Sequence, residues 1–451
     1  MSYSERLNAV IPGGAHTYSR GDDQYPSIAP QILARGKGAY VWDGDGNKFL
    51  DYGMALRAVT LGYSNERVNN AAIIQINNGV NLTRASVIEL EVAEKFIDLI
   101  PSAEMVKFAK NGSNVTTGAI KIARAYTGRR YVCFPRQHAF FSFDDWFIGK
   151  TLVTRGIPEE HYKYSLLFDY NEVNSLENLF NEYPDDIACI IMEPATMVGP
   201  CDPDCNFVCS VDKTCKDCPK NKTNFLQKVR EICHKNGALF ILDEMITGFR
   251  WHIQGAQTWF DVEPDISTFG KGMANGFSVA AIVGKKEFMS VGGIKETGSE
   301  RVFMLSTTHG AEMTALGAFK ETIDIYKEGK VISHLWQYGE KLYNGINNIS
   351  KENDLLDYVY MDGNYISMNF ATKNEKKEIS MEFRTLLLQE LIKGGVLAPW
   401  IAVSVAHGEV ELKLTFDAYE RALNVYKKAL EDGIDKYLVG PAVKPVFRKF
   451  N

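Results

Sequence analysis

From about residue 65 onwards, segments of helical periodicity alternate with short runs of apolar residues. Apolar positions recur every three or four residues in 87–100 and 225–237, which predicts amphipathic helices. Short runs at 105–110, 187–194 and 238–244 predict strands, and the last two are almost entirely apolar. Strands of this kind, separated by helices, indicate an α/β fold with a mainly parallel sheet that helices cover on both faces.

The two ends of the chain show a different pattern. Residues 38–53 place aromatic strand formers on both sides of a turn rich in Asp, Gly and Asn, which predicts a β-hairpin. Beyond about residue 310, long helical segments precede a few strands and a final helix, which is typical of a smaller α+β domain. We therefore expect an N-terminal segment at 1–60, a large α/β domain at 61–305 and a smaller domain at 306–451.

Charge and hydropathy narrow the classes of partner. The 451 residues carry a formal net charge of −6 and no long basic run, which argues against nucleic acid or an anionic membrane as a partner. No uncharged apolar stretch reaches the ~18 residues of a membrane span. The N-terminal sequence MSYSERLNAVIPGG has no apolar core of the kind that a signal peptide needs. We expect a cytoplasmic protein.

Chemically active residues follow the predicted strands. Glu193 and Asp243 end apolar runs, Gly112 and Ser113 open a helix after another strand, and Lys271 lies among glycines. Taken singly, such an acid is often only a cap and such a turn only a turn. In a parallel sheet, however, the carboxyl ends of the strands form the ligand site, and free N–H groups at a helix start bind phosphate. A lysine, a buried acid and a phosphate cradle together suit pyridoxal phosphate (PLP).

Longer motifs carry a resemblance to a known family. The chain resembles the class III, fold-type I PLP-dependent aminotransferases, and most closely their glutamate-1-semialdehyde 2,1-aminomutase branch. The matching motifs run nearly from end to end: IPGGAHTYSR, GAYVWDGDGNKFLDY, ARAYTGR, LDEMITGFR, FGKGMANG and STTHG. The resemblance implies a fold-type I transferase whose smaller domain joins both termini. It also implies a homodimer with shared active sites.

The resemblance assigns roles to matching residues. It implies that Lys271 forms the Schiff base with PLP and that Asp243 pairs with the pyridinium nitrogen. The other residues that it places at the cofactor are Gly112, Ser113 and Glu193, with Thr308, or Thr307 if the alignment slips, reaching the phosphate of the neighbouring subunit. Arg20 matches the arginine that receives a substrate carboxylate, a task that suits a guanidinium fork.

Three substitutions depart from the family pattern. The aromatic residue that stacks on the cofactor ring matches Phe140, with His138 as the competitor. Leu56 replaces a tryptophan, and Arg57 follows it. Arg57 either recognises an anionic substrate or pairs with a nearby acid, and the sequence does not separate these two readings. His309 begins a third changed segment, after the phosphate threonine.

A cysteine-rich insertion at about 200–220 is the fourth departure. It contains five thiols with the spacing C-x3-C-x3-C-x5-C-x2-C: Cys201, Cys205, Cys209, Cys215 and Cys218. In a reducing compartment this density favours a structural zinc ion. An iron–sulfur cluster and a loop of reduced thiols are the alternatives.

Three functions remain open. The first is a transaminase that acts on an anionic small metabolite or sugar, with a small-molecule amino donor and acceptor and a pyridoxamine phosphate intermediate. The second is an intramolecular aminomutase, which Arg20 favours. The third is an inactive, metal-stabilised scaffold, against which the retained Lys271 and Asp243 argue. A dinucleotide-binding dehydrogenase is excluded, because the glycines around Lys271 lack the G-x-G-x-x-G spacing.

Overall fold

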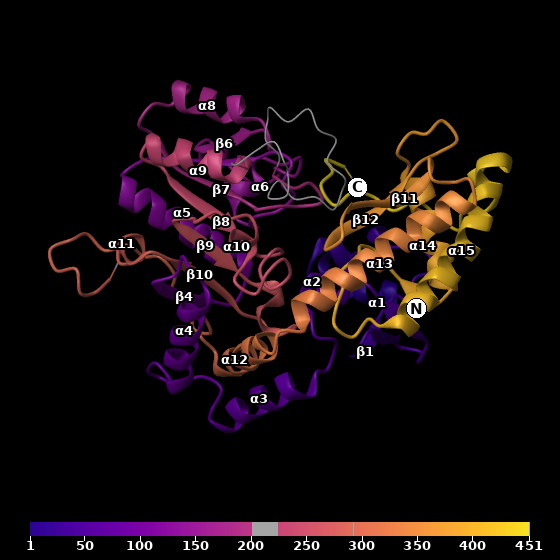
Figure 1. Ribbon diagram of the computed structural model, residues 1–451, viewed down its shortest axis with the longest axis horizontal. Coiled ribbons are helices and arrows are strands. Elements are labelled where there is room, and N and C mark those ends of the chain that lie inside the picture. The colour runs from indigo at the N-terminus through magenta and orange to yellow at the C-terminus, as the bar shows by residue number, and fades with distance from the viewer. Residues whose placement is uncertain (201–223, 292, 451) are drawn as a thin grey trace. The chain divides into compact units, whose positions relative to one another are not determined.

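The structure is a computed structural model that describes residues 1–200, 224–291 and 293–450 (Figure 1). The chain divides into two compact units. One consists of Met1–Asn65 and Ser333–Asn451, and we call it the terminal unit. The other consists of Glu66–Ile332, and we call it the central unit.

A seven-stranded sheet organises the described part of the central unit, in the order β4-β10-β9-β8-β7-β5-β6. All neighbouring pairs from β9 to β6 are parallel, and β10 is antiparallel to both β9 and β4. The strands are β4 (Met105–Ala109), β5 (Tyr131–Pro135), β6 (Ser165–Phe168), β7 (Ile187–Met192), β8 (Leu239–Asp243), β9 (Ile266–Phe269) and β10 (Ala280–Gly284). Strands β7 to β10 are buried along their whole length, as expected for a sheet covered on both faces.

Helices cover this sheet. Helix α5 packs across most of the strands, from β4 to β7, while α8 packs on β6 and α9 on β8. The helices are α3 (Glu66–Asn77), α4 (Val87–Leu99), α5 (Gly112–Thr127), α6 (Asp145–Ile148), α7 (Glu159–Tyr162), α8 (Val173–Glu182), α9 (Phe225–Lys235), α10 (Ala256–Trp259), α11 (Lys286–Met289) and α12 (Met313–Lys327). The predicted α/β fold with a mainly parallel sheet is confirmed.

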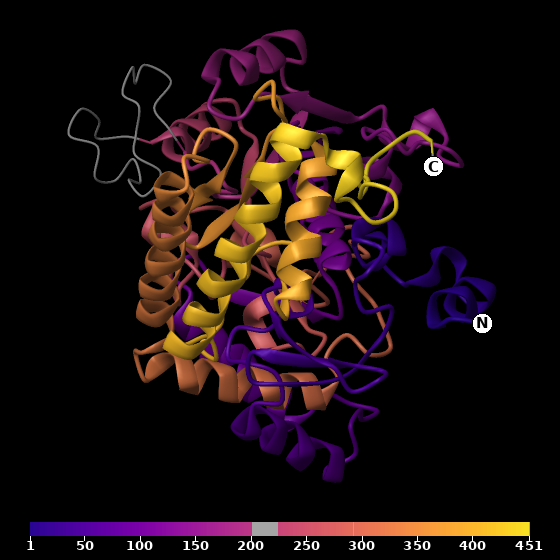
Figure 2. The same ribbon diagram turned by 90° about the vertical axis from the view of Figure 1, so that its right-hand side faces the viewer.

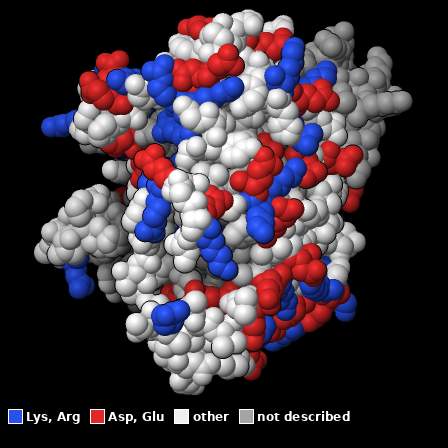
Figure 3. Space-filling view, turned by 90° about the vertical axis from the view of Figure 1, so that its left-hand side faces the viewer, with Lys and Arg blue, Asp and Glu red and all other residues white. Residues whose placement is uncertain are grey.

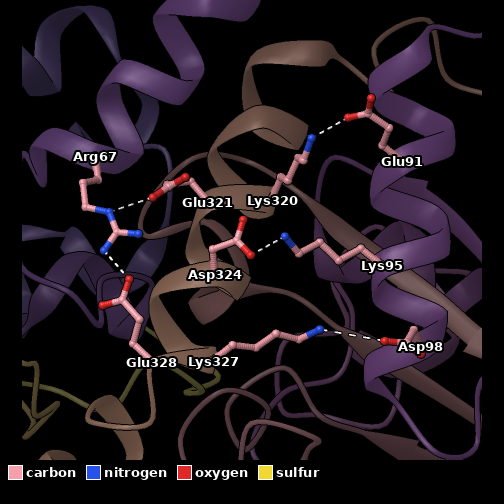
Figure 4. A network of polar contacts seen from close by, with 9 residues as sticks. All are labelled: Arg67, Glu91, Lys95, Asp98, Lys320, Glu321, Asp324, Lys327 and Glu328. Carbon is pink, nitrogen blue, oxygen red and sulfur yellow. Dashed lines mark hydrogen bonds and ion pairs between the residues drawn. The ribbon is translucent and has the colours of Figure 1, made fainter.

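Helix α12 belongs to the central unit, although the sequence pattern grouped 306–332 with the smaller domain. Its buried Phe319 packs edge to face on Phe96 of α4, with ring centroids 5.0 Å apart. Ion pairs also link α12 to α3 and α4 (Figure 4). The pairs are Arg67 with Glu321 and Glu328, Lys95 with Asp324, Lys320 with Glu91, and Lys327 with Asp98. Because surface ion pairs contribute little to stability, we attribute this grouping mainly to the packing of α12 against α3 and α4.

The terminal unit contains a four-stranded sheet in the order β1-β2-β3-β13 and a two-stranded sheet of β11 and β12, as far as the described residues show. The predicted hairpin is confirmed, since β2 and β3 are antiparallel with Trp42 opposite Lys48. Figure 2 shows α14 and α15 side by side in this unit. Its elements are α1 (Tyr3–Val10), β1 (Leu33–Lys37), β2 (Tyr40–Asp43), β3 (Lys48–Asp51), α2 (Met54–Arg57), β11 (Val359–Asn364), β12 (Ser367–Thr372), α14 (Met381–Lys393), β13 (Val396–Leu397) and α15 (Glu409–Asp432), with α13 (Val331–Glu352) leading into it.

Basic and acidic side chains are interspersed on the face of the molecule that Figure 3 shows. Within the part of the chain that the structure describes, no helix is both long and apolar enough to cross a membrane.

Candidate active site

Asp243 lies at the carboxyl end of β8, and its side chain is only 1% exposed. Its Oδ1 accepts hydrogen bonds from the backbone N–H of Met245, at 3.1 Å, and from Thr268 Oγ1, at 3.0 Å. Thr268 is the residue opposite Asp243 on β9. Burial raises the pKa of Asp243 to about 6, while the two hydrogen bonds and the positive charge of Lys271 oppose this rise. Asp243 is therefore a buried acid that a nearby cation stabilises in its ionised form.

Lys271 directly follows the next strand, β9, after a single glycine. It is half-buried and begins a 3-10 turn, Lys271–Ala274, with a φ of +38°. A side chain at Gly270 would place its Cβ 2.5 Å from Met245 Sδ, so the close approach of these two segments requires glycine. Because the charge of Lys271 affects the pKa of Asp243, the ammonium group and the carboxylate lie within electrostatic reach of each other.

A third strand, β4, leads directly into the start of α5. Asn111 caps the helix, accepting a hydrogen bond from the backbone N–H of Asn114 at 3.0 Å. The Cβ of any larger residue at Gly112 would lie 3.0 Å from Met245 Sδ, so Met245 contacts both this helix start and the segment before Lys271. The hydroxyl of Ser113 is buried and accepts a hydrogen bond from the backbone N–H of Phe143. The first N–H groups of such a helix lack intrahelical acceptors and suit a phosphate.

The predicted acid Glu193 follows β7 and is 5% exposed. Its backbone N–H donates to His138 Nδ1 at 3.1 Å. Burial lowers the pKa of His138 to about 3, which keeps the ring neutral, and its Nε2 has no partner among the described residues. Phe140, in contrast, is 49% exposed and contacts Phe147 edge to face. The Phe140 ring is thus free to stack on a ligand, whereas His138 offers a buried nitrogen.

Thr308 lies on the exposed surface of the central unit. Its carbonyl oxygen accepts a hydrogen bond from Asn81 Nδ2 at 3.0 Å. The alternative, Thr307, is also exposed, and a Cβ at Gly310 would lie 2.7 Å from its hydroxyl. The role of either threonine toward a neighbouring subunit stays a prediction.

The two predicted substrate arginines belong to the terminal unit. Arg20 ends a 3-10 turn, Tyr18–Arg20, and lines a cavity of about 950 Å³ together with Tyr63 and Trp400. Among the described residues, Arg20 forms no ion pair. Arg57 is half-buried at the end of α2 and has a polar or electrostatic partner of its own. Arg20 is the better candidate for binding an anion.

The five cysteines of the predicted metal loop lie outside the described residues. They are Cys201, Cys205, Cys209, Cys215 and Cys218. In the described ranges, no group of three or more His, Cys, Asp or Glu side chains could hold a metal ion. The zinc prediction therefore has no support from the structure. The three other cysteines, Cys133, Cys189 and Cys233, are buried free thiols, as expected.

Sequence reasoning missed two residues of this site and a buried acid next to it. Strand register places Thr268 against Asp243, and loop packing places Met245 against Gly112 and Gly270. The sequence carries no direct signal for either contact. Glu244 is fully buried next to Asp243 and accepts from the backbone N–H groups of Ala256, at 3.0 Å, and Gln257, at 2.8 Å. Burial raises the pKa of Glu244 to about 7. The available signal in the sequence was the second acid, which directly follows Asp243 at the end of an apolar run.

Comparisons with known proteins identify the family of the chain. The model of the family described as aminotransferase class-III matches residues 20–399. A 3-aminobutyryl-CoA aminotransferase of Cloacimonas acidaminovorans (strain Evry) is 30% identical over 434 residues, covering 95% of this chain and 98% of the relative. A glutamate-1-semialdehyde 2,1-aminomutase of Persephonella marina (strain DSM 14350 / EX-H1) is 30% identical over 439 residues, covering 93% and 97%.

A solved structure shares the fold. The FumI protein of Sphingopyxis sp. MTA144, solved in a PLP form, has a TM-score of 0.82 at 24% identity and covers 95% of this chain and 97% of its own. At that identity the match speaks for the fold alone. The family match, in contrast, extends over most of the sequence and includes both Asp243 and Lys271. The chain therefore belongs to the class-III aminotransferase family of PLP-dependent enzymes.

Proposed function

We propose that this protein is a transaminase that moves an amino group between two small molecules, at least one of them an anionic metabolite or sugar. The observation that carries this proposal is the buried carboxylate of Asp243, which lies within electrostatic reach of Lys271 at neighbouring strand ends. An inactive relative has no need to keep an acid buried at this position, because the burial opposes its ionisation.

The residues of the site fit the cofactor of the family. Asp243 is buried and suited to hold a proton on the ring nitrogen, and the glycines at 112 and 270 let Met245 pack closely between the two strand ends. When bound, PLP withdraws electrons from the carbon that carries the amino group. Lys271, as a free amine, moves the proton at that carbon. The start of α5, at Gly112 and Ser113, holds the phosphate.

Other residues of the chain have supporting roles in this proposal. Phe140 covers one face of the ring, Glu193 and His138 lie beside it, and Thr308 reaches the phosphate bound by a second copy of the chain. Arg20 receives a carboxylate of the substrate, which its lack of an ion-pair partner among the described residues supports. The relatives carry the names of an aminotransferase and of an aminomutase, so the intramolecular aminomutase is the second candidate.

One experiment separates the two candidates. The PLP-loaded protein is mixed with a single amino compound and no 2-oxo acid, using 3-aminobutanoate in one reaction and glutamate 1-semialdehyde in another. A transaminase gives at most one product molecule per active site, and addition of pyruvate or 2-oxoglutarate starts continuous turnover. Sustained isomerisation of glutamate 1-semialdehyde without an acceptor would instead establish the aminomutase.

Thr268→Val is expected to weaken PLP binding about fivefold near pH 6 and very little at about pH 8. The Thr268 hydroxyl bonds to the ionised form of Asp243 and so lowers its pKa, which burial has raised to about 6. Without this bond the pKa of Asp243 rises further, and a smaller fraction of the carboxyl group is ionised near pH 6. PLP titrations followed by absorbance measure the dissociation constant at each pH.

Ser267→Ala is the matched control for this variant. Ser267 is the neighbouring strand residue, equally buried, and its hydroxyl has no partner among the residues that the structure describes. We expect unchanged PLP binding for Ser267→Ala at both pH values. Equal weakening at both pH values in Thr268→Val would contradict the assignment, because a pure packing defect does not depend on the ionisation of Asp243.

A further inference from the structure

Helix α2, Met54–Arg57, is a left-handed turn. Its four residues have positive φ angles: 40° for Met54, 50° for Ala55, 60° for Leu56 and 68° for Arg57. Residues with a Cβ adopt this conformation at a cost in free energy, and normally one at a time. None of the four is glycine, so surrounding contacts must hold the turn.

Two side chains bind the backbone at the start of this turn. Asp51, which is 4% exposed, accepts from the N–H groups of Gly53, at 2.7 Å, and Met54, at 3.0 Å. The Tyr63 hydroxyl donates to Asp51 Oδ2 at 2.6 Å and accepts from the Ala55 N–H at 2.8 Å. One carboxylate and one hydroxyl thus bind three successive N–H groups, those of Gly53 and of the first two residues of the turn.

The position of Tyr63 is itself closely determined. Its backbone forms two hydrogen bonds with Gly38, of 2.8 and 2.9 Å. A Cβ at Gly36 would lie 2.7 Å from the Tyr63 ring, so only glycine allows this contact. The ring therefore cannot move toward β1, and its hydroxyl points to Asp51.

The left-handed turn forms part of the wall of the cavity that contains Arg20. Ala55 and Leu56 line this cavity of about 950 Å³, as do Arg20 and Trp400. The Trp400 indole N–H donates to the Gly53 carbonyl at 3.0 Å and fixes the turn from another side. Arg20 and Tyr63 line the same cavity, and the positive charge of Arg20 opposes the rise in the pKa of Tyr63 that burial causes.

We propose that Asp51 and Tyr63 are positioning residues that hold the left-handed turn as a fixed wall beside Arg20, and that Leu56 on this wall limits the size of the substrate group next to the bound carboxylate. This inference rests on the proposed function, in which Arg20 receives that carboxylate. The ligand class that fits this cavity is a carboxylate that carries only a small substituent close to the carboxyl group.

The test uses PLP-loaded protein and three amino donors that share a carboxylate and differ in size at the amine-bearing carbon: β-alanine, 3-aminobutanoate and 3-amino-3-phenylpropanoate. Leu56→Ala is expected to improve kcat/KM for the phenyl donor about tenfold relative to β-alanine, because a wall side chain is removed. Tyr63→Phe is expected to raise KM for the small donors about tenfold while kcat changes little, because the wall loses its hydrogen bonds.

Tyr40→Phe is the matched control. Tyr40 lies in the same unit, outside the cavity, and its hydroxyl donates to Glu411 Oε1 at 2.8 Å, so this variant also loses a tyrosine–carboxylate bond. We expect no change in the ranking of the three donors. If Tyr40→Phe changed KM and the donor ranking as much as Tyr63→Phe does, the proposal would be overturned. The effect would then follow from the loss of any tyrosine–carboxylate hydrogen bond in this unit.

A rescue variant separates positioning from stability. Ala55→Gly removes the penalty for positive φ at one residue of the turn and is expected to raise the unfolding temperature, alone and in combination with Tyr63→Phe. The double variant is expected to regain stability but not the low KM. Recovery of both would show that Tyr63 acts only through stability.

These results stay distinct from a failure of the proposed function. If the wild-type protein transferred no amino group from any donor, the proposed function would fail, whereas the thermal unfolding data would still test the strained turn. If wild-type protein were active and Leu56→Ala left the donor ranking unchanged, the proposed role of the wall would be overturned and the transaminase would stand.

Discussion

Lys271→Ala is expected to reduce amino-group transfer by at least about 10³-fold, because in the proposed function this one residue both attaches PLP and carries the proton. The fold should persist, since Lys271 begins a short turn after β9 and leaves the sheet register untouched. Steady-state kinetics measure the loss, and the absorption spectrum of the bound cofactor reports the loss of its covalent link to the protein.

Lys235→Ala is the control for this experiment. Lys235 is the last residue of α9 in the same unit, and it is exposed. Its substitution by alanine removes one positive charge, as Lys271→Ala does. We expect wild-type activity and an unchanged spectrum. If Lys271→Ala retained more than a few per cent of the activity, another amine would have to carry the reaction and our assignment of the site would be wrong.

Asp243→Asn is expected to lower activity by about 100-fold or more, because a neutral amide does not keep a proton on the ring nitrogen of the cofactor. The local structure should remain. The Oδ1 of asparagine still accepts from the Met245 N–H and from the Thr268 hydroxyl, which are the two hydrogen bonds that Asp243 makes.

The same variant has an expected effect on stability in the absence of PLP. The pKa of Asp243 is raised by burial from 3.8 to about 6, so the folded state takes up the proton more readily than the unfolded state. The resulting stabilisation is fully present below the unfolded pKa and is lost as pH rises through about 6. Near pH 7 the ionised carboxylate therefore costs on the order of 3 kcal/mol, which asparagine avoids.

Thermal unfolding of the cofactor-free proteins tests this expectation. Asp243→Asn should unfold at a higher temperature than the wild type near pH 7, and the difference should shrink toward pH 4, where both side chains are neutral. Glu244→Gln is the matched control, because Glu244 is adjacent and equally buried but lies outside the proposed cofactor contacts. We expect it to alter stability while keeping activity within about tenfold of the wild type. If both variants lost the same activity, any substitution at this strand end would impair the enzyme, and the specific role of Asp243 would be contradicted.

Local patterns in the sequence predicted the elements that carry the site. Apolar runs without polar alternation at 187–194 and 238–244 correspond to β7 and β8, which are buried along their whole length. The parallel arrangement then brings Glu193 and Asp243 to the same edge of the sheet. The pattern of apolar residues was sufficient to predict these two strands, because a strand that is buried on both faces is apolar along its own length.

Contacts between distant segments lay beyond the reach of these patterns. The boundary at 306 followed a change in periodicity, but α12 joins the central unit because Phe319 packs on Phe96, more than two hundred positions away. The cysteine-rich insertion remains a prediction, since its residues are not described. Phe140 and His138 were competing candidates for one role, and the structure gives them different environments without assigning that role.

The sequence by itself determined the order of strands and helices and the hairpin at 38–53, and it led to the proposal that Asp243 and Lys271 are the reactive pair. Each of these depends on local composition or on motifs of a few residues. Only the tertiary structure decided which hydroxyl bonds to Asp243, which residue lies between Gly112 and Gly270, and that four ordinary residues form a left-handed turn. The physical reason is that strand register, close approach and backbone strain arise from contacts between segments that no local pattern specifies.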